Sequence, residues 1–205
     1  MNKKLYFDKE ISIIEHVSNM LDTQAFEFVL NSLKNSQKIS IVGSSRKHNS
    51  IFLNHLINML DSQKRILLIE KQPNLAIQQN VKRLNLYPNI EDNETLSAIT
   101  NILTKNADCI ALNNIKNDRV FDFLVNNSNS QIIATFSNIT LNIKDLQSRN
   151  TPISDFLINS DIIIKIGNLY GSYIVENIIK VENDKFLSLI KYDAEQNRWT
   201  KVSIL

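Results

Sequence analysis

Eight residues, Gly43 to Ser50 (GSSRKHNS), have the length and the end residues of a phosphate-binding loop of the pattern G-x-x-x-x-G-K-[ST]. In such a loop, glycines let backbone N–H groups surround phosphate oxygens, a lysine neutralises their charge, and the final hydroxyl binds Mg²⁺. Here the first glycine and the final hydroxyl are present, but His48 stands at the second glycine and Asn49 at the lysine. The spacing of a phosphate site is therefore kept, while most of its chemistry is absent.

Each remaining residue of this segment has a functional and a structural interpretation. Gly43 could cradle a phosphate or end a strand in a tight turn, and Ser50 could bind Mg²⁺ or cap a helix. Arg46 or Lys47 could replace the missing lysine, or could be solvated charges. His48 tolerates the positive φ that a glycine adopts, so the turn could persist there without the phosphate cradle.

Outside this segment, the sequence offers few other candidates for chemistry. Glu70 ends a second apolar run, and its carboxylate could hold a metal-bound water or be kept for structure. His16 and His55 lie in helical segments without further ligands at metal-binding spacing, so we predict no metal site. The sequence also shows no Ser–His–Asp or Cys–His arrangement that would indicate nucleophilic catalysis.

Length and composition favour one soluble domain. The chain has 205 residues, and its net charge of +2 creates no general basic field for nucleic acid or anionic membranes. The single cysteine, Cys109, lies in an apolar run and has no intramolecular disulfide partner. The start, Met1 to Tyr6, lacks the apolar core of a signal peptide, and no run has the length of a membrane span. We therefore expect a cytoplasmic protein.

Alternating apolar runs predict an α/β fold. Ile39–Val42 is the expected central strand, and apolar residues at helical spacing follow the loop as far as Leu60. Further strands are predicted at Ile66–Ile69, Val81–Leu86, Ala107–Leu112, Ile132–Phe136 and Ile162–Ile166, and further helices at Lys9–Leu21, Gln24–Leu33, Asn93–Leu103, Arg119–Val125 and Ile143–Gln147. Because several of these strands are continuous apolar runs, we expect a mostly parallel sheet that is buried on both faces.

The C-terminal part has a different pattern. Gly167 and Gly171 mark a turn, and strands are predicted at Tyr173–Val181, Lys185–Lys191 and Arg198–Ile204. Short connections between them favour antiparallel pairing. We expect a helical lead-in over residues 1–36 and an α/β domain with an antiparallel C-terminal β extension over residues 37–205.

Several strings along the chain together resemble one family. They are RILLIEKQPNL (65–75), NVKRL (80–84), DCIALNNIK (108–116), RVFDFL (119–124), QIIATFSN (131–138), SDIIIKI (160–166) and YIVENIIKV (173–181). In this order they resemble the C-terminal RecA-like ATPase domain of the type II and type IV secretion ATPases, most closely the branch that powers tight-adherence (Flp) pili. The resemblance extends from Ala25 to the C-terminus and implies a RecA-like P-loop NTPase core.

The resemblance also implies which catalytic groups are missing. The glutamate that polarises the attacking water in the family corresponds to Asn114, and a histidine of the family corresponds to Ser137. An asparagine can orient a water but cannot accept its proton. Of the polar catalytic set, only Glu70 and Ser50 keep their residue types. One transition-state contact of this kind is worth about 3 kcal/mol or more, so several losses predict a protein that does not hydrolyse ATP.

These observations leave three functional hypotheses. The first is a catalytically inactive relative that acts, without a cofactor, as a scaffold or regulatory subunit of a type IV pilus, type II or type IV secretion machine. The alternative is an atypical nucleotide-binding switch or slow ATPase that binds ATP and Mg²⁺ through Gly43, Arg46, Lys47, Ser50 and Glu70. A third is a cytoplasmic adaptor that retains only the fold.

The first hypothesis also predicts the partners. A catalytic secretion ATPase paralogue or the inner-membrane platform protein of the same machine is expected, with no nucleic acid and no direct insertion into a membrane. Because only the helical lead-in precedes the core, we do not expect the family's larger N-terminal domain, which contributes much of the contact between subunits. We therefore expect a monomer or dimer in isolation, which reaches the inner membrane only through its partners.

Overall fold

The structure, a computed structural model, describes residues 20–21, 23–35, 38–70, 75, 81–85, 107–116, 118–126, 128–183 and 185–202. For residues 81–85, 120 and 124 it describes the backbone only. The predicted helix Asn93–Leu103, and Lys9–Leu21 except for its last two residues, lie outside these ranges. None of the helices in the described part combines the length and the apolar character needed to cross a bilayer.

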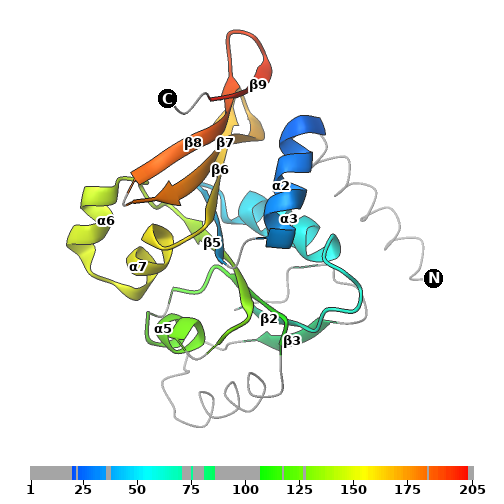
Figure 1. Ribbon diagram of the computed structural model, residues 1–205, viewed down its shortest axis with the longest axis vertical. Helices are drawn as coiled ribbons and strands as arrows, with labels where there is room; N and C mark the ends of the chain where they lie inside the picture. Colours follow the sequence, from blue (N-terminus) through cyan, green and yellow to red (C-terminus); the bar gives the residue numbers. More distant parts are fainter. Residues whose placement is uncertain are drawn as a thin grey trace.

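The described strands form one sheet in the order β3-β2-β4-β5-β1-β6-β7-β8-β9 (Figure 1). The strands are β1 (Lys38–Gly43), β2 (Ile66–Glu70), β3 (Val81–Asn85), β4 (Cys109–Asn113), β5 (Gln131–Ser137), β6 (Ile162–Leu169), β7 (Ser172–Glu182), β8 (Lys185–Asp193) and β9 (Arg198–Lys201). All pairs from β3 to β6 are parallel, and all pairs from β6 to β9 are antiparallel. The predicted fold class is confirmed, with β1 at the centre between β5 and β6.

Helices cover both faces of the parallel part (Figure 1). They are α2 (Thr23–Asn35), α3 (Arg46–Asn58), α5 (Asp118–Asn126), α6 (Ile143–Arg149) and α7 (Pro152–Ile158). Buried side chains of α2 and α3 pack on one face of the sheet, and those of α5, α6 and α7 pack on the other. The core under α2 and α3 is called the first core, and the core under α5, α6 and α7 the second core. The strand β1 is continuously apolar because Ile39 and Ile41 belong to the first core and Val42 belongs to the second.

The helix α7 was not predicted from the sequence. Its start nevertheless carries a local signal. Thr151 is the N-cap, with its hydroxyl accepting a hydrogen bond from the Ser154 N–H, and Pro152 occupies the first turn. Phe156 and Leu157 then anchor the helix in the second core.

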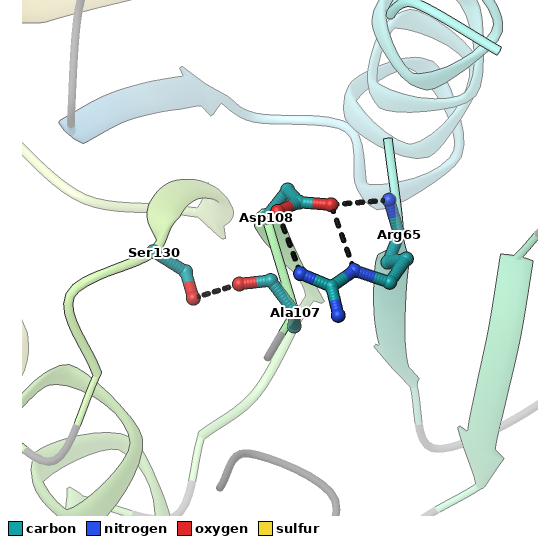
Figure 2. Close-up of polar contacts among 4 residues, drawn as sticks. All are labelled: Arg65, Ala107, Asp108 and Ser130. Atoms are coloured by element: carbon teal, nitrogen blue, oxygen red, sulfur yellow. Dashed lines mark hydrogen bonds and ion pairs between the residues drawn. The ribbon is translucent and has the colours of Figure 1, made fainter. Parts of the chain in front are cut away.

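An ion pair fixes two strands together at the amino ends of the parallel strands (Figure 2). Arg65 donates from its backbone N–H, Nε and Nη2 to the Asp108 carboxylate, at 2.8, 3.1 and 3.1 Å. These bonds hold the pKa of Asp108 down at about 2. The neighbouring strand β5 is attached to the same region through the Ser130 hydroxyl, which donates to the Ala107 carbonyl. These contacts hold the amino ends of β2, β4 and β5 together. The candidate site lies at the opposite edge of the sheet, where the carboxyl ends of the parallel strands meet.

Candidate functional site

The connection between β1 and α3 is much shorter than a phosphate-binding loop requires. β1 ends at Gly43 and α3 begins at Arg46, so only Ser44 and Ser45 lie between strand and helix. Ser45 is the N-cap, and its side chain accepts a hydrogen bond from the His48 N–H. The Asn49 N–H donates to the Ser45 carbonyl at 3.1 Å. Two N–H groups that a phosphate cradle would use are thus hydrogen-bonded within the helix start.

Two interpretations of this segment were wrong. Ser50 does not cap the helix, because α3 has already begun four residues earlier and Ser45 provides the cap. His48 does not adopt the positive φ of a loop glycine, since it lies in the first turn of α3 and is absent from the described residues with positive φ. The physical reason is the same for both. The Ser45 side chain accepts a hydrogen bond from the His48 N–H and so starts the helix at Arg46, which leaves no open loop before Ser50.

The side chain of Asn49 occupies the inside of the strand–helix connection. The residue is fully buried, and its Nδ2 donates to the Phe136 carbonyl at 2.8 Å and to the Gly43 carbonyl at 3.3 Å. A Cβ added to Gly43 would lie 2.5 Å from Asn49 Oδ1 and 2.9 Å from the Ile166 carbonyl oxygen. Gly43 is therefore required for close packing, a reason that differs from both the phosphate cradle and the tight turn considered for this glycine.

An aromatic contact covers the outer side of the same helix start. The rings of His48 and Tyr173 stack with their centroids 3.4 Å apart and an interplanar angle of 14°. The Nδ1 atom of His48 lies 2.7 Å from the Ser45 hydroxyl. Because Tyr173 belongs to β7, the antiparallel extension packs directly against the start of α3.

Neutral side chains join α3 to the carboxyl ends of β4 and β5. The Asn113 Oδ1 atom lies 2.8 Å from the Ser50 hydroxyl, 2.9 Å from Asn114 Nδ2 and 3.2 Å from the Thr135 hydroxyl, and it accepts hydrogen bonds from all three. Asn114 Nδ2 also donates to the Ser50 oxygen at 3.2 Å. The Ser50 hydroxyl also lies 2.9 Å from the Arg46 carbonyl, so its single proton has two acceptors, and one of its lone pairs accepts from Asn114. The candidate Mg²⁺ ligand is thus part of a protein hydrogen-bond network.

The other predicted site residues are placed as follows. Glu70 is fully buried at the end of β2, next to Asn113 in the strand register. Ser137 ends β5 opposite Gly43. Arg46 and Lys47 are exposed on the first turn of α3. The edge therefore gathers Glu70, Ser50, Asn114 and Gly43 in its interior, whereas the two cations point to solvent.

Four residues of this edge were not singled out from the sequence: Ser45, Asn113, Thr135 and Tyr173. Ser45 could have been identified as an N-cap, because a serine directly before a segment with apolar residues at helical spacing is a typical helix start. Thr135 could have been noticed as a hydroxyl inside an apolar strand. In the described ranges, no three His, Cys, Asp or Glu side chains come together as a metal site.

Three solved structures share this architecture. The VirB11 ATPase from the Brucella suis type IV secretion system, crystallised with sulphate, superimposes with a TM-score of 0.58 at 16% identity and covers 87% of this chain. The pilus retraction motor PilT with bound ADP gives 0.51 at 12% identity over 82% of the chain. The Legionella pneumophila ATPase DotB gives 0.53 at 9% identity over 77%.

The chain spans 57%, 52% and 49% of the lengths of these three proteins, or about half. No protein-family model and no curated protein sequence matches it. At these identities the similarity concerns the fold, and it agrees with the resemblance found in the sequence strings. The chain therefore has the RecA-like fold of the ATPase domain of type II and type IV secretion ATPases.

Proposed function

We propose that this chain is a non-catalytic domain with the secretion-ATPase fold, acting as a scaffold or regulatory subunit of a type IV pilus, type II or type IV secretion machine. The similarity to VirB11, PilT and DotB supports the type of machine. The geometry of the β1–α3 connection supports the absence of catalysis. Its partner, in this proposal, is a catalytic ATPase paralogue or the membrane platform protein of the machine.

The position of Asn49 is the single observation that carries the proposal. Its amide donates to two main-chain carbonyls inside the connection, where a phosphate-binding loop needs a cation directed at the ligand. A neutral amide contributes no charge to a phosphate, and its burial leaves it no freedom to turn outward without breaking both hydrogen bonds. The side chain thus replaces ligand binding with internal packing.

The Ser50–Asn113–Asn114 network supports the same conclusion for Mg²⁺ and water. Three neutral side chains hydrogen-bond to one another where a Mg²⁺ ligand and a general base would be needed. Asn114 can hydrogen-bond a water but cannot accept its proton, so this position supplies no base for hydrolysis. Glu70 is the remaining carboxylate of the predicted site, and it is fully buried.

Titration calorimetry with ATP and Mg²⁺ tests the absence of nucleotide binding. We expect no saturable heat from the unmodified chain. The alternative, a nucleotide switch, is tested by the pair Lys47→Ala and Lys144→Ala, because both lysines are exposed but only Lys47 lies beside the β1–α3 connection. Tight binding that is lost in Lys47→Ala and kept in Lys144→Ala would establish the switch and refute a nucleotide-free role.

Co-purification from the native cells, followed by mass spectrometry, tests the scaffold role. Recovery of an intact secretion ATPase or of its platform protein is the expected result. The combined variant His48→Gly, Asn49→Lys and Asn114→Glu restores the types of three catalytic residues and serves as a control. It should not improve the recovery of the partner, because the proposed association does not use nucleotide. A bait without partners, or with unrelated ones, would refute the scaffold role.

A further inference from the structure

Tyr170 stands out at the turn between β6 and β7. The turn consists of Tyr170 and Gly171, both with positive φ, 49° and 87°. Two-residue hairpin turns of this kind favour Asn-Gly, because both positions are left-handed. Tyr170 is 95% exposed, and a Cβ placed on Gly171 would have no atom within 4 Å. The ring thus projects from the tip of a hairpin into open space.

The residue type at this position is exceptional among the residues that the structure describes. The other non-glycine residues with positive φ in the described ranges are all asparagines: Asn114, Asn138, Asn150, Asn183 and Asn197. Asparagine tolerates this backbone conformation, whereas a bulky aromatic residue is strained in it. The exposed ring of Tyr170 gains no burial within its own chain that would offset the strain. Strain of this kind at an exposed aromatic points to contact with another molecule.

A pocket on another part of the chain has features complementary to a tyrosine ring. It has a volume of about 430 Å³, enough for one aromatic side chain, and lies among α5, α6, α7 and the segment after β5. Its apolar side chains are Ile139, Leu146 and Ile153, which pack on the second core. In Figure 1 the helices α6 and α7 lie side by side, and they are in contact. We call this hollow the α5–α7 pocket.

The charged residues of the α5–α7 pocket suit a phenol. Lys116 and Arg149 are exposed on its lining, and neither forms an ion pair with the described part of the chain. Both cations are attracted to the face of an aromatic ring. Asp118, also on the lining, can accept a hydrogen bond from a phenolic hydroxyl. An apolar base, two cations and one acceptor match the ring and the hydroxyl of tyrosine.

We propose that Tyr170 of one copy of this chain inserts into the α5–α7 pocket of a second copy. The proposal is independent of the proposed function, because it uses no residue of the β1–α3 connection. One aromatic side chain buries roughly 150–250 Å², whereas a standard interface buries about 800 Å² on each partner. The contact is therefore the anchor of a weak association that grows with protein concentration.

Sedimentation equilibrium over a concentration series tests the contact. The unmodified chain should shift from monomer toward dimer or larger species as the concentration rises. Tyr170→Asn, which suits the backbone of the turn, and Arg149→Glu, which reverses a charge on the pocket, should each weaken the association by about tenfold or more. Lys144→Glu makes the same charge change on α6 outside the pocket lining, and it should associate like the unmodified chain. Circular dichroism verifies that each variant is folded.

Mixing the two defective variants gives the decisive result. Tyr170→Asn retains an intact pocket, and Arg149→Glu retains an intact Tyr170, so an equal mixture should associate more strongly than either variant alone. Labelling one variant at its N-terminus with a fluorophore lets sedimentation detect the mixed species. A chain that remains monomeric at every concentration, a Tyr170→Asn variant that associates normally, or a mixture without mixed species would each overturn the proposal.

Discussion

Asn49 Oδ1 lies so close to the α-carbon of Gly43 that a side chain on Gly43 would overlap it. The corresponding Nδ2 atom donates to the carbonyl of the same glycine, so the two residues are matched in both shape and hydrogen bonding. The segment that resembles a phosphate-binding loop has therefore kept its glycine for a different reason. The glycine accommodates an internal amide instead of a ligand.

This match predicts a destabilising effect of Gly43→Ala. The new Cβ would lie 2.5 Å from Asn49 Oδ1 and 2.9 Å from the main-chain oxygen of Ile166, and the second contact cannot be relieved by a side-chain rotation. Overpacking of a core costs typically about 1–3 kcal/mol, and we expect the free energy of unfolding to fall by that amount. Urea denaturation followed by circular dichroism measures it. In a double-mutant cycle, Asn49→Ala should recover part of the loss, and an unchanged midpoint for Gly43→Ala would contradict this packing.

Two substitutions of Asn49 are expected to lower the free energy of unfolding by different amounts. Asn49→Ala removes two hydrogen bonds and leaves the Phe136 carbonyl without this donor, which should cost about 1–3 kcal/mol. Asn49→Asp should cost more, because it places a buried carboxylate against two carbonyl oxygens. Denaturation midpoints at neutral pH measure both variants. An aspartate variant as stable as the alanine variant would show that the amide does not face these carbonyls.

Much of the fold could be predicted from the sequence because its strands are bounded apolar runs. Side chains of Ile39–Val42 face the helical layers on both sides of the sheet, and a continuous apolar run of this kind predicts a buried parallel strand from the sequence alone. The antiparallel extension was also predicted, although β9 is shorter in the described residues than the predicted strand. Helix α7 was missed because its signal is a cap and a proline, which periodicity does not detect.

The interior of the candidate site could not be predicted in the same way. The residues of the degenerate segment were identified, but the role of Asn49 depends on Phe136, which lies 87 positions away in the sequence. The three groups that donate to Asn113 likewise come from α3, from the residue that follows β4, and from β5. Only the folded register brings these elements together. A motif read along one segment therefore indicates which residues are unusual, but not which partners they contact.

The Arg65–Asp108 pair predicts how stability depends on acid. The guanidinium and main-chain hydrogen bonds from Arg65 lower the pKa of Asp108 to about 2 in the folded protein, below about 3.9 in an unfolded chain. The contribution of the pair is thus complete above about pH 4 and is lost as the pH falls toward 2. Urea midpoints over this range should fall less steeply in Asp108→Asn. Asp122→Asn, at an exposed position on α5, should behave like the unmodified protein, and equal slopes in all three would refute the assignment.

The burial of Cys109 predicts that its thiol reacts only when the protein unfolds. The residue is fully buried in β4, between its register neighbours Ile66 and Gln131, and burial raises the pKa of its thiol to about 12. The thiolate is the reactive form, so both the lack of access and the raised pKa suppress reaction at neutral pH. We expect the native protein to react with a thiol-specific disulfide reagent far more slowly than the urea-unfolded chain. The rate should increase with urea in parallel with the unfolded fraction, and Gly43→Ala should accelerate it at a fixed urea concentration. Rapid reaction without denaturant would show that the β4 strand opens locally, against the burial described for it.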